Sequence, residues 1–196
     1  MIDDAILFLQ RRLNRALQEE SDPAISGSAE AKVVLPDGTK LRDAFDFKLG
    51  AVTLLLLSIE EERALRPDDA YLRVAANGAR QKTSPEVRLN LNVLLVSHFQ
   101  EYGDSLKYLS RIIQHVQAHR VMNRVNSPDL SDHIQQLVLE LVTPSWSELN
   151  EIWGSLRTAC RPCALYRVKM LVFRADETPP AAEVGEMHLD LREIRA

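Results

Sequence analysis

Cys160 and Cys163 are the residues most suggestive of chemistry, because their C-x-x-C spacing is found in redox couples and in half-sites for zinc. A redox pair needs a helix N-terminus or positive charge to lower the pKa of its leading thiol. Here the pair follows the C-terminal end of a predicted helix, whose dipole opposes a thiolate. Zinc needs about four ligands, and the chain has no second cysteine pair. The sequence therefore favours two small, half-buried residues in a turn between a helix and a strand. A redox or metal-handling role for Cys160 and Cys163 stays open as the alternative.

Two further groups of residues are weak candidates for a functional site. His115 and His119 are four residues apart on a predicted helix, a spacing seen in metal sites, but no third ligand accompanies them. The carboxylates in "IEEER" (59–63) mark the point where a strand leaves the core more often than a catalytic or cation site. No serine has the context of a nucleophile elbow. The sequence therefore predicts no enzyme and no cofactor.

Composition narrows the class of protein. The 196 residues are 45% hydrophobic and 27% charged, which suits one core rather than two. The net charge of −4 gives no basic face for nucleic acid. No apolar run approaches the ~20 residues of a membrane span, and the acidic opening "MIDDAILFLQRR" differs from a secretory signal. We expect folding in the bacterial cytoplasm.

The spacing of apolar residues predicts an α+β domain over residues 1–175, with a mixed or antiparallel central sheet covered by helices. A capping box is expected from Ser145 and Glu148, and Trp146 and Trp153 are both assigned to the core. The stretch 63–86 is predicted as a long exposed loop with a contact role. The predicted elements are a helix over 2–17 with Leu9, Leu13 and Leu17 on its apolar stripe, a hairpin or extended excursion over 32–41, strands over 51–62 and 87–99, a helix over 102–116 whose apolar stripe begins with Tyr102 and Leu106, a strand over 133–142, a helix from 145 to 156 and a strand over 165–173.

Residues 176–196 are predicted as a separate, extended C-terminal arm. A proline-rich acidic linker leads to "EMHLDLREI" (186–194), in which apolar and polar residues alternate as in a half-buried strand. Such a strand needs a sheet edge, either its own or a neighbour's. The candidate subunit or sheath interface consists of Met187, Leu189, Leu191 and Ile194.

Several segments together resemble the cap, or tail-terminator, family of contractile injection systems of the Photorhabdus virulence cassette and antifeeding prophage type. They are "MIDDAILFLQRRLN", "TLLLLSIEEER", "VRLNLNVLLVSHF" with the helix after it, and "SELNEIWGSL" followed by "LYRVKMLVF". They occur in family order and cover most of residues 1–173. Cys163 departs from the small polar residue usual there, which weakens cysteine chemistry further. Residues after Asp176 lie outside the resemblance.

The resemblance implies a structural role. Members form a ring, expected to be hexameric, that closes the end of the sheath and inner tube and limits their length. The implied partners are other copies of the chain, sheath subunits and inner-tube subunits, in a particle assembled in the cytoplasm and released from it. As an alternative, the chain keeps an assembly role but belongs to another ring of the same particle.

Overall fold

The computed structural model describes residues 1–19, 31–37, 44–62, 72–74, 80–82 and 88–172. Its helices are α1 (Ile2–Gln18), α3 (Tyr102–Ala118) and α4 (Trp146–Leu156). Its strands are β1 (Val33–Val34), β2 (Ala51–Glu61), β3 (Leu72–Val74), β4 (Arg80–Lys82), β5 (Arg88–His98), β6 (Val121–Asn123), β7 (Ile134–Val142) and β8 (Cys163–Val172). Within the described residues, none of the helices is long and apolar enough to cross a membrane.

Six strands form one mixed sheet in the order β1-β2-β5-β8-β7-β6. All neighbours are antiparallel except β1, which runs parallel to β2 over two residues. The α+β single domain with a mixed sheet is therefore confirmed. The predicted domain boundary after residue 175 stays a prediction, because it falls outside the described residues.

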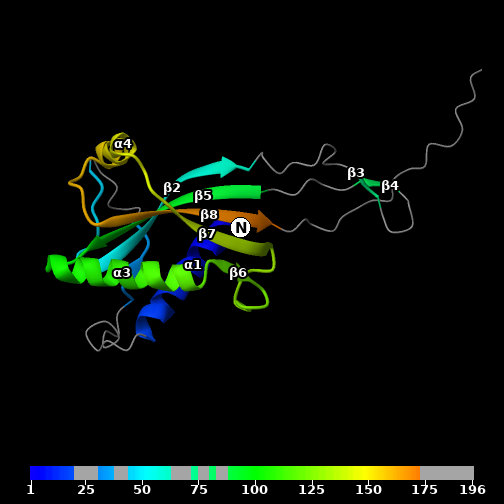
Figure 1. The fold of residues 1–196 in the computed structure, drawn as a ribbon, viewed down its shortest axis with the longest axis horizontal. Helices are drawn as coiled ribbons and strands as arrows, with labels where there is room; N and C mark the ends of the chain where they lie inside the picture. Colours follow the sequence, from blue (N-terminus) through cyan, green and yellow to red (C-terminus); the bar gives the residue numbers. More distant parts are fainter. Residues whose placement is uncertain (20–30, 38–43, 63–71, 75–79, 83–87, 173–196) are drawn as a thin grey trace, which may run out of the picture.

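The two faces of the sheet are covered differently (Figure 1). Helices α1 and α3 pack on one face, where a large core includes Phe8, Leu91 and Leu137, each fully buried. Helix α4 packs on the opposite face over a smaller cluster centred on Trp153. Since α4 spans only eleven residues, it covers part of that face.

Helix α1 is joined to the sheet by polar side chains as well as by its apolar stripe. Asn14 on α1 donates from Nδ2 to the carbonyl of Val33 at 2.8 Å and accepts the Val33 N–H on Oδ1 at 2.9 Å. One side chain thus satisfies both backbone groups of Val33, as a neighbouring strand would. The β1 strand is held between α1 and β2 for this reason.

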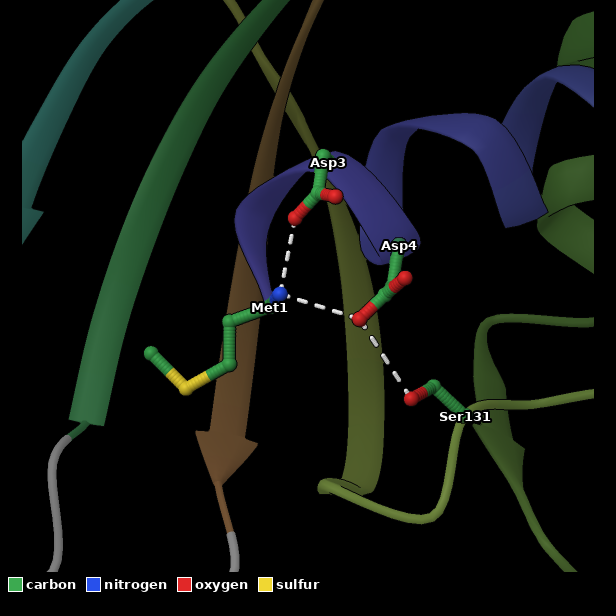
Figure 2. Close-up of polar contacts among 4 residues, drawn as sticks. All are labelled: Met1, Asp3, Asp4 and Ser131. Atoms are coloured by element: carbon green, nitrogen blue, oxygen red, sulfur yellow. Dashed lines mark hydrogen bonds and ion pairs between the residues drawn. The ribbon is translucent and has the colours of Figure 1, made fainter.

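The connection between β6 and β7 runs alongside α1 and is tied to it twice. Arg15 forms an ion pair with Asp129 at 3.2 Å. Near the start of the helix, Asp4 accepts a hydrogen bond from Ser131 at 3.4 Å while also pairing with the Met1 amine at 2.9 Å (Figure 2). Hydrogen bonds to Asp3 and Asp4 raise the pKa of that amine. These contacts lie at the surface and orient α1 more than they stabilise it.

Two sequence predictions need correction. On α3 the predicted stripe included Tyr102 and Leu106, which are 67% and 43% exposed. Relative to the predicted orientation, α3 is rotated about its axis. Its inward face is set by Ser105, which accepts the Phe99 N–H, and by Tyr108, which stacks on Phe99 with ring centroids 4.4 Å apart. The stretch 63–86 is more than a loop, since β3 and β4 pair within it, away from the main sheet (Figure 1). Of the hairpin or extended excursion predicted over 32–41, residues 32–37 are described, and Val33–Val34 form the extended strand β1, parallel to β2.

Candidate functional site

The sheet face that carries α4 is open beyond that helix. The covered end holds Leu94, Val96 and Leu165, which pack with Trp153. Further along the same strands, the side chains on this face become polar and charged. We call this set the polar ladder. Its members are Ser58, Glu60, Asn90, Asn92, Glu140, Arg167 and Lys169, of which Asn90 is buried and the others are partly or fully exposed.

The register of four strands aligns the polar ladder in rows. One row runs Ser58, Asn92, Arg167 and Glu140 across β2, β5, β8 and β7. The next row places Glu60 opposite Asn90 and Asn90 opposite Lys169. Because directly opposed side chains on one face lie within contact distance, each row is a chain of cross-strand neighbours.

Hydrogen bonds connect the polar ladder within and between its rows. Asn92 donates to the Ser58 hydroxyl at 2.9 Å and to Glu60 at 2.6 Å, and its carbonyl oxygen accepts from Arg167 Nε at 3.4 Å. On the neighbouring strands, Lys169 Nζ and Glu140 form an ion pair at 2.7 Å. Asn92 therefore links β2 to β8 through one amide group.

The polar ladder is suited to docking rather than to catalysis. It contains two carboxylates and two cations, so its formal charges balance. Glu60 is engaged by an amide and Glu140 by an ammonium group, so both are already used as acceptors. A balanced set of donors and acceptors held in register by strands offers a polar contact surface to another protein.

A groove of about 510 Å³ lies between the polar ladder and α4. Its floor includes Asn92 and Arg167, and its wall on α4 carries Glu148 and Glu151. The predicted capping box is confirmed at this end of α4: Ser145 Oγ accepts the Glu148 N–H at 3.3 Å, and Glu148 accepts the Ser145 N–H at 2.7 Å. The hydrogen bond from the Ser145 backbone holds the pKa of Glu148 below its usual value.

The described parts of the chain offer no group of three or more histidine, cysteine, aspartate or glutamate residues placed to hold a metal ion. The family model of the Pvc16 N-terminal domain matches residues 5–186. The chain belongs to that family.

Two solved structures share the fold of this Pvc16 N-terminal domain. One is a cryo-EM structure of an extracellular contractile injection system, the PVC sheath/tube terminator in extended state, with a TM-score of 0.57 and 14% identity. The other is the cryo-EM structure of the anti-feeding prophage cap, described as the AFP tube terminating cap, with a TM-score of 0.53 and 18% identity. The match covers 100% of this chain and 65% of the first, and 91% of this chain and 58% of the second.

The chain thus spans about two thirds or less of the length of these two proteins. No curated protein matches it. Membership of the Pvc16 N-terminal domain family confirms the resemblance found in the sequence.

The two tryptophans of this family member differ in their surroundings. Trp153 is 5% exposed and meets Phe47 edge-on, with ring centroids 5.9 Å apart, so its assignment to the core is confirmed. Trp146 is 87% exposed, so the same assignment was wrong for it. It occupies the first helical position after the Ser145 cap, beside an apolar hollow of about 290 Å³ that also includes Leu149.

The cysteine pair lies in the connection between α4 and β8. Cys160 is exposed, Cys163 is partly buried as the first residue of β8, and both thiols are free. Burial, with a smaller effect of Cys160, raises the pKa of the Cys163 thiol. A redox pair needs the opposite shift. The turn between a helix and a strand was predicted, and the structure places the pair there.

His115 and His119 are adjacent on the last turns of α3, with ring centroids 4.5 Å apart. Burial of the His115 ring, assisted by His119 and by Arg12 on α1, lowers its pKa to about 4, and Glu19 opposes this weakly. His115 is therefore partly buried against α1, whereas His119 is exposed. The surroundings of His115 favour its neutral form.

The shifted pKa of His115 predicts a pH dependence of stability. The unfolded chain binds a proton at about pH 6.5 and the folded chain at about 4, so the free energy of unfolding falls as pH decreases between these values. We expect a loss of about 1–2 kcal/mol, because solvent contact reduces the full linkage effect. When it is measured by chemical unfolding between pH 4 and 7, the free energy of unfolding should depend less steeply on pH in His115→Gln than in the unsubstituted protein. The exposed His133→Gln serves as control, and equal slopes for both variants would contradict the assignment.

The interface residues predicted from the arm, Met187, Leu189, Leu191 and Ile194, lie outside the described residues. The structure instead draws attention to the polar ladder, which the sequence analysis did not identify as a site. The signal was present as asparagines alternating with leucines in β5 and as Arg167 and Lys169 alternating with apolar residues in β8. Alternation shows that one face is polar, but only the strand order brings the two sets together.

Proposed function

We propose that this chain is the structural cap, or tail terminator, of a phage-tail-like contractile injection particle. The observation that carries the proposal is the Pvc16 N-terminal domain match over residues 5–186. It is supported by two proteins of the same fold that are a sheath/tube terminator and a tube terminating cap.

In this proposal, copies of the chain form a ring, with six-fold symmetry expected, at the end of the sheath and inner tube. In a cyclic ring, each copy contacts its two neighbours through two different surfaces, and the rotation between successive copies closes the ring. The finished ring presents no further surface for tube or sheath addition, so it limits particle length. The function is binding and exclusion, without catalysis.

The polar ladder and the groove beside α4 are the surfaces we assign to partner contact. A face of balanced charge recognises a partner by register and by hydrogen bonds rather than by net attraction. Residues Met187, Leu189, Leu191 and Ile194 are proposed as a second contact, to an adjacent subunit of the ring. The particle is assembled in the bacterial cytoplasm and then released.

Removal of the chain from particle-producing cells tests the function. Without it, electron micrographs should show tubes and sheaths of widely varying length with unclosed ends, because nothing stops subunit addition. Re-expression of the chain should restore a narrow length distribution. The Cys160→Ser/Cys163→Ser variant should restore it equally, which separates the structural role from a thiol-dependent one. Normal lengths and closed ends in the absence of the chain would refute the proposal.

A further inference from the structure

Two large apolar side chains are more exposed than the others among the described residues. Val125 is 95% exposed and Trp146 is 87% exposed, whereas the next, Tyr102, is 67% exposed. A single apolar residue at the surface is common in proteins, so exposure alone assigns no role. These two stand out because hydrogen bonds fix the backbone that carries each of them, and because they lie at separate places on the domain.

Val125 lies in the turn between β6 and β7, and side-chain amides tie that turn together. Asn123 Oδ1 accepts the backbone N–H groups of Val125 at 3.0 Å and of Asn126 at 3.1 Å. Asn126 in return accepts the Asn123 N–H at 2.8 Å and donates to the Val121 carbonyl at 2.8 Å. The connection is also joined to α1 at two points. Docking through Val125 therefore requires little further ordering of the backbone.

The hollow beside Trp146 is lined mostly by apolar side chains. Its volume is about 290 Å³, and its lining includes Leu141, Pro144 and Leu149. Trp146 is the first residue of α4, and the capping box at Ser145 fixes that end of the helix. A hollow below the ~300–1,000 Å³ of small-molecule sites suits one or two protruding side chains of another protein.

The turn with Val125 and the hollow lie at opposite ends of strand β7 (Figure 1). The turn comes before Ile134, where β7 begins, and α4 follows Val142, where β7 ends. A strand of nine residues is about 30 Å long. Val125 therefore does not reach the hollow of its own chain, and a contact between the two features must join two copies.

The charges next to the two features are opposite in sign. Segment 120–126 contains two arginines and no carboxylate, whereas segment 145–151 contains two glutamates and no basic residue. Arg124 already pairs with Asp132 at 3.1 Å, and Arg120 is exposed. Opposite charges favour contact between the turn of one copy and the α4 end of another, whereas like charges disfavour contact between two identical ends.

We propose that Val125 of one copy inserts into the hollow beside Trp146 of the adjacent copy and so joins neighbours in the ring. This inference rests on the ring proposed above. An apolar projection and an apolar hollow at different places on one molecule make a heterologous contact, which closes into a ring when the rotation permits. Trp146 is then a buried aromatic anchor, a residue type that often carries much of the energy of an interface.

Disulfide trapping in the full-length chain tests the contact. With both native cysteines replaced by serine, Val125→Cys is combined in turn with Thr143→Cys and with Leu149→Cys, two positions that line the hollow. At least one combination should oxidise to covalent oligomers on non-reducing gels, because docked residues reach the Cβ–Cβ separation of a disulfide. The matched control is Asn150→Cys, an exposed position on α4 outside the hollow, which should remain uncross-linked.

Substitution of the projecting residue gives a second measurement, by light scattering. Val125→Asp should raise the concentration needed for ring formation about tenfold or more, because the contact would bury an unpaired carboxylate. Val125→Ile keeps the projection apolar and should leave assembly nearly unchanged. Both variants should fold normally, because the side chain is 95% exposed in the single copy. Circular dichroism checks this.

The outcomes separate this contact from the ring itself. A ring that yields no cross-link to the hollow, or that forms equally well with Val125→Asp, refutes the contact and leaves the cap proposal standing. An unsubstituted chain that stays monomeric and yields no cross-link also refutes the contact, and particle length in cells that lack the chain then decides the cap proposal. If Val125→Asp restored normal length in those cells and Trp146→Asp did not, the hollow would contact a sheath or tube subunit, and this proposal would be wrong.

Discussion

Replacement of Trp153 with alanine is expected to lower the free energy of unfolding by about 3–5 kcal/mol. The side chain is 5% exposed and is the centre of the cluster between α4 and the sheet, with Phe47, Leu94 and Val96 around it. Its loss leaves a cavity that the short α4 helix cannot close, because the capping box fixes one end of that helix. Denaturant unfolding followed by far-ultraviolet circular dichroism measures the change without relying on tryptophan fluorescence.

Trp146→Ala is the matched control for this measurement. The same residue type is removed from the same helix, seven positions earlier, where it is 87% exposed. We expect a change within about 0.5 kcal/mol. Equal losses for the two variants would show that the α4 cluster does not contribute as described.

Replacement of Asn14 with leucine is expected to cost about 2–4 kcal/mol, through hydrogen bonds rather than through a cavity. Val33 is fully buried, and its N–H and carbonyl both bond to the Asn14 side chain. Leucine offers neither partner, and a buried backbone group without one costs about 1–3 kcal/mol. The carbonyl keeps some compensation from Gln10, which donates to it at 3.2 Å. Thermal and denaturant unfolding measure the effect.

Arg11→Leu provides the control for Asn14 on the same helix. Arg11 is exposed, so the same new side chain there should change stability by less than about 0.5 kcal/mol. If Asn14→Leu were no more destabilising than Arg11→Leu, the attachment of β1 to α1 through this side chain would be incorrect. Loss of the β1 contact should also increase amide exchange at Val52, whose N–H bonds to the Lys32 carbonyl.

Sequence periodicity predicted the buried residues correctly where one face of an element is continuously apolar. The stripe of α1 placed Leu9, Leu13 and Leu17 in the core, and all three are buried. It was insufficient where polar residues enter the core through specific bonds. Ser105 faces inward on α3 because its hydroxyl accepts a backbone N–H, and no apolar count includes a serine.

The candidate site was harder to predict than the fold. The capping box was found because it depends on residues three apart in the chain. The polar ladder depends on contacts such as Arg167 with Asn92, which are 75 residues apart, and on the insertion of β8 between β5 and β7. Sequence spacing contains the polar alternation of each strand but not the order in which strands become neighbours. Trp146 was misplaced for a related reason, because a position on the apolar stripe of a short helix does not guarantee that the sheet extends beneath it.

The central position of β8 has a consequence for biogenesis. β5 and β7 each pair with β8 and not with each other, yet β8 is the last described strand to emerge during synthesis. A nascent chain that ends before Cys163 therefore holds two incomplete half-sheets, each with an exposed apolar margin. Such intermediates invite aggregation and are the species that chaperones bind. The six-stranded sheet can be completed only after residues 163–172 have left the ribosome.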